Sequence, residues 1–315
     1  MEARSEGIVR QVSSRSVGVE EELLLVEPET GQPQAVAETV LAAAQDAAAP
    51  TAGADRRAGD GTALEFELKQ QQLEINSEPC RTLDELHRDI RRGRAAAAAA
   101  ERAGVRVAAL ATSPVPVEPK VVGTSRYRRM DDVFGLTAHE QLTCGCHVHV
   151  GISSDEEGVA VLDRIGPWLS VLLALSANSP FWQGQDSSYA SFRYQVWGRW
   201  PGSGPTEPFR TAHSYHETVR QMVQTGTLLD EGMVYFDARL SGHYQTSGSL
   251  SNRSDHKILV RPTATTTAPR GRCSSAPLKW RARTAIIPML RLCRCSRAAA
   301  VLLLVRAAPS PRSAA

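Results

Sequence analysis

Alternating apolar and polar residues predict β-strands along much of the chain. The segment GVEEELLLV (18–26) predicts a first strand that ends near Pro28, with a turn at Thr30 and Gly31. Further strands are expected within 63–79, which holds one or two of them, and at 105–114, 147–151 and 233–241.

Apolar residues at helical spacing predict helices at 81–104, 153–180 and 211–226. In the first helix Thr82 and Glu85 have the spacing of a capping box, and Gly104 is a suitable stop. We expect a loop with a short helix at 125–141, and an aromatic and polar connection at 181–205. Strands and helices do not alternate as regular βαβ units, which predicts an α+β fold with an antiparallel sheet.

The first strand carries carboxylates on both of its faces. Glu20 and Glu22 share one face, about 7 Å apart from two residue rises. The other face is core-like and consists of Val19, Glu21, Leu23 and Leu25. An edge strand with its acids in water would explain this pattern. The alternative is an inner face on which cations must neutralise the acids, because buried uncompensated charge is costly.

Two other strands repeat a polar face. Glu74 shares a face with Gln70 and Gln72, and the segment CGCHVHVGI (144–152) places His147 and His149 on one side of a strand. The spacing of the cysteines and histidines does not fit structural zinc, and the absence of H-E-x-x-H weighs against a zinc hydrolase. Oxygen ligands with one imidazole favour Mg²⁺ or Mn²⁺ that bridges phosphates.

Phosphate chemistry also requires cations from the protein. Arg193 and Arg239 are the candidates, although either spacing also fits a surface arginine. Neither a Walker A motif nor G-x-G-x-x-G occurs, so a nucleotide would need another scaffold.

Composition and charge narrow the classes of protein. The chain has 315 residues, 42% of them hydrophobic, which suits a globular protein. The sequence shows neither an apolar leader nor an apolar run long enough to span a bilayer. We therefore expect a cytoplasmic protein that does not bind membranes. Residues 241–315 hold thirteen Lys or Arg and one acid, Asp255. A basic arm that binds nucleic acid is one interpretation, but with Trp280 as its single tryptophan it lacks a stacking platform for specific binding.

Six segments in order resemble the glutamate–cysteine ligase type 2 family, the YbdK-like carboxylate–amine ligases: GVEEELLLV, QQLEINSEPCRTLDEL, RYRRMDDVFG, CGCHVHVGI, SPFWQGQDSSYASFRYQVWGRWP and GMVYFDARLS. The resemblance implies a glutamine-synthetase-like funnel, formed by a curved antiparallel sheet with helices outside. It implies that ATP phosphorylates the γ-carboxylate of glutamate, and that cysteine or another amine attacks the acyl phosphate. It also implies that the substrates are small molecules. Because one edge of the sheet would be exposed, we keep a homo-oligomer as an alternative to a monomer.

The resemblance assigns site residues on the matching motifs. Metal ligands fall on Glu20, Glu22, Glu74 and His147, and nucleotide or phosphate contacts are expected from His147, His149 and Arg193. Arg193 and Arg239 are the expected catalytic cations.

The chain departs from the family after Tyr244. The family continues there with a strand that carries Glu-x-Arg, whereas residues 245–315 of this sequence contain no Glu. We therefore expect a ligase domain at 16–246, incomplete at its C-terminal side, and a basic tail at 247–315. A shifted reading frame would explain this tail, which we expect to be disordered. Without the Glu and Arg the enzyme is expected to be weak or inactive.

Overall fold

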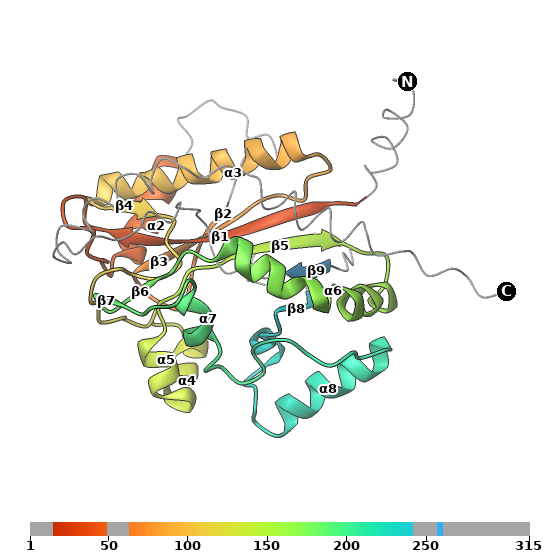
Figure 1. Ribbon diagram of the computed structural model, residues 1–315. Helices are drawn as coiled ribbons and strands as arrows, with labels where there is room; N and C mark the ends of the chain where they lie inside the picture. Colours follow the sequence, from red (N-terminus) through yellow and green to blue (C-terminus); the bar gives the residue numbers. More distant parts are fainter. Residues whose placement is uncertain (1–14, 49–62, 242–256, 261–315) are drawn as a thin grey trace.

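The computed structural model describes residues 15–48, 63–241 and 257–260, and its centre is one seven-stranded sheet (Figure 1). The strand order is β2-β3-β1-β5-β9-β8, and β4 also pairs with β1. All of these pairs are antiparallel. The strands are β1 (Val17–Val26), β2 (Ala63–Phe66), β3 (Gln72–Asn76), β4 (Arg106–Ala108), β5 (Cys146–Gly151), β8 (Ala238–Ser241) and β9 (Lys257–Val260). The predicted α+β class with an antiparallel sheet is confirmed.

Helices cover both faces of this sheet. In Figure 1, α2 and α3 lie above the sheet and α4, α5 and α8 lie below it. The helices are α2 (Ala37–Ala48), α3 (Leu83–Ala97), α4 (Ser125–Phe134), α5 (Leu136–Glu140), α6 (Asp155–Ser176), α7 (Phe192–Trp197) and α8 (Ala212–Gln224). Short 3₁₀ helices, η1 (Ala98–Ala103) and η2 (Glu231–Met233), and a small hairpin of β6 (Phe181–Trp182) and β7 (Gln185–Asp186) complete the described part.

The helix starts follow the sequence signals. The Thr82 side chain accepts a hydrogen bond from the Glu85 backbone, and the Glu85 side chain accepts from the Thr82 backbone, which confirms the capping box of α3. Gly104 ends η1 in the left-handed conformation that favours glycine. The Ser154 side chain accepts a hydrogen bond from the Glu157 backbone N–H and caps α6.

One face of the sheet forms the main helix-covered core. Val19 of β1 pairs with Val148 of β5, and both belong to a buried cluster that also contains Leu86 of α3 and Leu162 of α6. Glu21 shares this face and is 5% exposed. Its carboxylate accepts two hydrogen bonds from the Arg94 guanidinium of α3, from Nε at 2.7 Å and from Nη2. This ion pair fixes α3 across β1, the central strand.

Several elements differ from the sequence predictions. Helix α2 was not predicted, the segment 125–141 forms two helices instead of a loop with one, and α7 lies inside the expected connection 181–205. Helix α6 continues through Pro167 and is long and apolar enough to cross a membrane. It packs on α8 and β8 and starts with three acidic residues, while Trp168, Val171 and Leu175 in its C-terminal half are exposed.

Strand β9 lies within the range 247–315 that was expected to lack order, and for these four residues the expectation is wrong. β9 fills the position between β5 and β8, where Leu259 pairs with His149 on one side and with Arg239 on the other. The other residues of 247–315 lie outside the described part of the chain. The boundaries of the expected domain at 16–246 stay a prediction.

Candidate functional site

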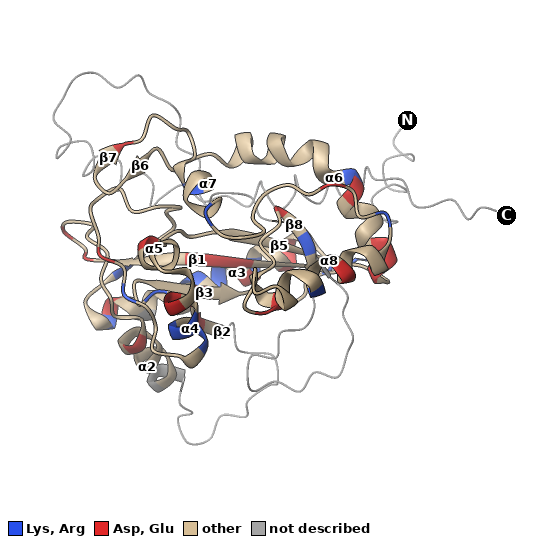
Figure 2. Ribbon diagram, turned by 90° about the horizontal axis from the view of Figure 1, so that it is seen from below, with Lys and Arg blue, Asp and Glu red and all other residues tan. Residues whose placement is uncertain are grey.

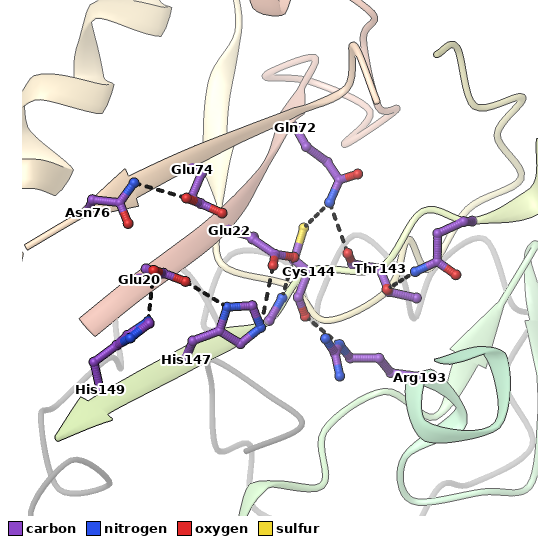
Figure 3. Close-up of polar contacts among 12 residues, drawn as sticks. Glu20, Glu22, Gln72, Glu74, Asn76, Thr143, Cys144, His147, His149 and Arg193 are labelled. Atoms are coloured by element: carbon purple, nitrogen blue, oxygen red, sulfur yellow. Dashed lines mark hydrogen bonds and ion pairs between the residues drawn. The ribbon is translucent and has the colours of Figure 1, made fainter. Parts of the chain in front are cut away.

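The strand register brings the predicted acidic and imidazole side chains onto the second face of the sheet. Glu20 pairs with His147 of β5, and Glu22 pairs with Glu74 of β3. Directly opposite residues in antiparallel strands point to the same face, so these side chains meet beside one another. Figure 3 shows the resulting cluster on β1, β3 and β5.

Glu20 forms an ion-pair group with the two histidines. One carboxylate oxygen lies 3.0 Å from His147 Nδ1, and the other lies 2.7 Å from His149 Nε2. Burial opposes the ionisation of Glu20, but the hydrogen bonds with His147 and His149 outweigh it and hold the pKa of this carboxyl well below its usual range. Glu20 is therefore a carboxylate whose charge the imidazoles stabilise.

Glu22 belongs to a second group, with Glu67 and Glu74. One oxygen of each carboxylate lies within 4.8 Å of the others, which makes this trio a candidate cation site. The Glu22 side chain is held from behind, because the Gly145 backbone N–H donates to its Oε2 at 2.8 Å. Glu67 was not predicted as a ligand. It follows directly after β2, yet the alternation from Leu64 to Leu68 in the sequence would have placed it on the same face as Glu65.

Burial and neighbouring carboxylates oppose ionisation in this trio. Burial, and then the charge of Glu22, raise the pKa of Glu67 to about 8. Burial, and then the charges of Glu20, Glu67 and Glu22, raise the pKa of Glu74 well above its usual range. Like charges in a low-dielectric site favour protonation unless a cation neutralises them. Carboxylate oxygens are the ligands that Mg²⁺ and Mn²⁺ prefer, so the donor set fits either ion.

The two carboxylate groups open into a cavity of about 170 Å³. Acidic positions of β1 appear in red near the centre of the view from below (Figure 2). Across the cavity lie aromatic rings from α4, α7 and the segments that follow: Tyr127, Trp197, Trp200 and Tyr235. Two arginines, Arg126 and Arg239, also line it. The site therefore combines a carboxylate wall, an aromatic wall and two cations.

The two lining arginines differ in their partners. Arg126 Nε and Nη2 donate to the two carboxylate oxygens of Asp230 at 2.8 and 2.9 Å, so its charge is compensated. Arg239 Nη1 donates to the Leu240 carbonyl at 3.2 Å, and its Nε has no hydrogen-bond partner among the described residues. Arg239 thus offers a donor near the cavity, and its catalytic role stays a prediction. Arg126 was not predicted.

The remaining predicted residues lie away from the cavity surface. His149 and Arg193 are not among the residues that line it, whereas His147 is. Arg193 is 1% exposed and lies behind the start of β5, where its Nε donates to the Cys144 carbonyl at 2.7 Å. The prediction that Arg193 contacts a nucleotide gains no support from this position.

The cysteines beside the histidines take no part in the cluster of ligands. Burial raises the pKa of the Cys144 thiol well above its usual range, and Gln72 Nε2 donates to its Sγ at 3.4 Å. Cys80, Cys144 and Cys146 are free thiols in the described part of the chain. A buried thiol with a raised pKa is unreactive, which agrees with a packing role for Cys144.

Comparisons with known proteins identify the family. The family model of glutamate–cysteine ligase family 2 (GCS2) matches residues 16–251. A Streptomyces avermitilis protein named "Putative glutamate--cysteine ligase 2-1" is 52% identical over 271 residues, which are 85% of this chain and 71% of that protein. A Streptomyces coelicolor protein, "Putative glutamate--cysteine ligase 2", is 50% identical over the same shares.

Two solved structures are similar to this chain in fold. A glutamate–cysteine ligase from Francisella tularensis, solved in complex with AMP, has a TM-score of 0.55 at 14% identity, with 78% of this chain and 60% of that chain covered. A bifunctional glutathione synthetase from Pasteurella multocida gives the same TM-score and identity over 97% of this chain and 43% of that one. The family match and the relatives agree with the six sequence motifs, and the chain belongs to glutamate–cysteine ligase family 2.

Proposed function

We propose that this protein is an ATP-dependent carboxylate–amine ligase that joins the γ-carboxylate of L-glutamate to the amine of L-cysteine. The observation that carries the proposal is the trio Glu22, Glu67 and Glu74, whose ligand oxygens lie within 4.8 Å of one another in the wall of a cavity. Uncompensated buried carboxylates of this kind are suited to a divalent cation that accompanies a nucleotide triphosphate.

The proposed reaction has two steps. An oxygen of the glutamate γ-carboxylate attacks the γ-phosphorus of ATP, and ADP leaves. The neutral amine then attacks the acyl carbon, inorganic phosphate leaves, and the nitrogen loses a proton. The products are γ-glutamylcysteine, ADP and phosphate. Another amine acceptor would follow the same chemistry.

The residues that line the cavity have different roles in this proposal. Glu22, Glu67 and Glu74 would hold Mg²⁺ or Mn²⁺, with Glu20 and His147 beside them. The bound ion supplies Lewis-acid stabilisation of phosphate charge. Arg239 offers a guanidinium N–H to the negative charge that develops on the transferred phosphoryl group, and preorganised donors of this kind give the largest single catalytic effect.

Aromatic residues limit the access of water to the cavity. Trp197, Trp200 and Tyr235 cover the cavity with apolar surface, which would limit hydrolysis of the acyl phosphate by water.

We further propose that this chain works more slowly than its relatives. In place of the expected Glu-x-Arg strand, β9 contributes Leu259 to the site face, between His149 and Arg239. Loss of one preorganised electrostatic partner costs on the order of 10²–10³ in rate.

Cytoplasmic location and a lack of nucleic-acid binding also stay predictions.

The test is ADP release from Mg²⁺·ATP with glutamate, in the presence and absence of cysteine, with product identification by mass spectrometry. We expect ADP release that requires both glutamate and an amine, and that Glu67→Gln abolishes. A parallel assay uses a version whose reading frame is restored after Tyr244, for which we expect faster turnover. ADP release that is independent of glutamate, or silence of the restored version with every amine tried, would contradict the proposal.

A further inference from the structure

Arg193 is a fully buried cation at the start of α7, away from the cavity surface. Its backbone N–H donates to the Ser179 hydroxyl at 3.1 Å, and its Nε donates to the Cys144 carbonyl at 2.7 Å. The guanidinium carbon lies 5.2 Å from the centre of the Trp197 ring, a distance at which a cation is attracted by an aromatic face. Burying an arginine is costly, so its contacts must serve the structure around it.

The Cys144 carbonyl that Arg193 holds belongs to the same peptide unit as the Gly145 N–H. This N–H donates to Glu22 Oε2 at 2.8 Å, and the Glu22 backbone N–H donates in turn to the Gly145 carbonyl at 3.0 Å. Because a peptide unit is planar and rigid, a pull on its carbonyl fixes the direction of its N–H. Hydrogen bonds in such a chain also polarise and strengthen one another. Arg193 and Glu22 are thus linked through one peptide plane (Figure 3).

The space around Gly145 shows how tightly this arrangement is packed. A Cβ atom at position 145 would lie 2.8 Å from Arg193 Nη2, 3.1 Å from His147 Nε2 and 3.4 Å from Glu22 Oε1. Three polar side chains therefore converge on the glycine. A side chain at this position would displace the Arg193 guanidinium and crowd the His147 ring, while its contact with the Glu22 carboxylate would be an ordinary van der Waals contact.

We propose that Arg193 is a positioning residue, which orients Glu22 for the cation through the Cys144–Gly145 peptide without touching the substrates. The proposal rests on the proposed function, because it takes Glu22 as a cation ligand. The Nε and backbone N–H of Arg193 bind protein groups, whereas its Nη2 has no hydrogen-bond partner among the described residues.

The experiment measures Mn²⁺ binding directly, by electron paramagnetic resonance of the free ion, on the intact chain and on Arg193→Gln and Arg193→Lys. Arg164→Gln on the exposed side of α6 serves as the matched control. We expect Arg193→Gln to raise the Kd for Mn²⁺ by about 10–100-fold, as loss of an outer partner of a metal ligand typically does. Arg193→Lys, which keeps the charge, should recover part of the affinity, and Arg164→Gln should bind as the parent does.

A second readout separates positioning from substrate contact. At saturating Mg²⁺, the Kd for ATP should be the same in Arg193→Gln and in the parent. An unchanged Kd for Mn²⁺ together with weaker ATP binding at saturating Mg²⁺ would overturn the proposal and make Arg193 a nucleotide contact.

Gly145→Ala provides a second test of the positioning role if the Arg193 variants do not fold. The added methyl group presses on Arg193 Nη2 and leaves every hydrogen-bonding group in place, so we expect a weaker Mn²⁺ affinity with a retained melting transition. Gly145→Ala with parental Mn²⁺ affinity would contradict the positioning role. A parent that binds no Mn²⁺ would instead contradict the metal site of the proposed function, so the two failures are distinguishable.

Discussion

Leu259 of β9 pairs with Arg239 of β8 across an antiparallel ladder, so an apolar side chain lies beside a cation of the proposed site. Leu259 is 1% exposed, and Arg239 Nε has no hydrogen-bond partner among the described residues. His149 is the partner of Leu259 on its other side. The position between a histidine and an arginine therefore suits a carboxylate better than a leucine.

Position 259 should tolerate a carboxylate side chain better than a cationic one. Leu259→Glu places a negative charge opposite Arg239, whereas Leu259→Lys places like charges opposite each other, which destabilises cross-strand pairs. We expect Leu259→Glu to melt at a higher temperature than Leu259→Lys, and to raise ligase turnover above that of the parent. Leu259→Gln controls for shape without charge. Equal melting temperatures for the Glu and Lys variants would show that Arg239 does not face position 259.

The acid trio predicts a stability that depends on pH in the metal-free protein. The pKa of Glu67 is raised to about 8 in the fold, so between its ordinary value near 4.5 and about 8 the folded state binds more protons than the unfolded state. The free energy of unfolding should therefore fall as pH rises through this window. Glu67→Gln should flatten the decline, and Mg²⁺ should reverse it. Denaturant titrations at pH 5, 6.5 and 8 measure this, and a metal-free parent that is more stable at pH 8 than at pH 5 would contradict the account.

The ion pair between Glu21 and Arg94 predicts a different kind of loss. Arg94→Met leaves the Glu21 carboxylate buried without its main partner, which typically costs about 3–5 kcal/mol of stability. The double variant Glu21→Leu with Arg94→Met removes both charges and should recover most of this loss. Chemical denaturation of the three proteins gives the coupling energy. Additive losses in the double variant would mean that the pair does not hold α3 on β1.

Much of the site face could be predicted from the sequence because it depends on strand periodicity. Glu20 with Glu22, and His147 with His149, had to share a face once their segments were strands, and the register confirms that Glu20 and His147 meet. Glu67 was missed although the alternation from Leu64 to Leu68 includes it. Its approach to Glu74 depends on how the chain turns between β2 and β3, which periodicity does not show.

The roles of the arginines depend on packing, which one sequence does not reveal. Arg193 and Arg239 both stand in motifs of the family, yet one is buried behind β5 and the other lines the cavity. Strand β9 was missed for another reason. Its apolar run is only three residues long, Ile258 to Val260, and it is stabilised by pairing with β5 and β8 from distant parts of the chain.

The most direct test of the central claim is a Mn²⁺ titration of the parent and of Glu67→Gln, followed by electron paramagnetic resonance. The account predicts that the parent binds Mn²⁺, that Mg²⁺ competes for it, and that Glu67→Gln, which removes one of three carboxylate ligands, binds it much more weakly. Equal Mn²⁺ binding by the two proteins, or no binding by the folded parent, would contradict a cation site at Glu22, Glu67 and Glu74.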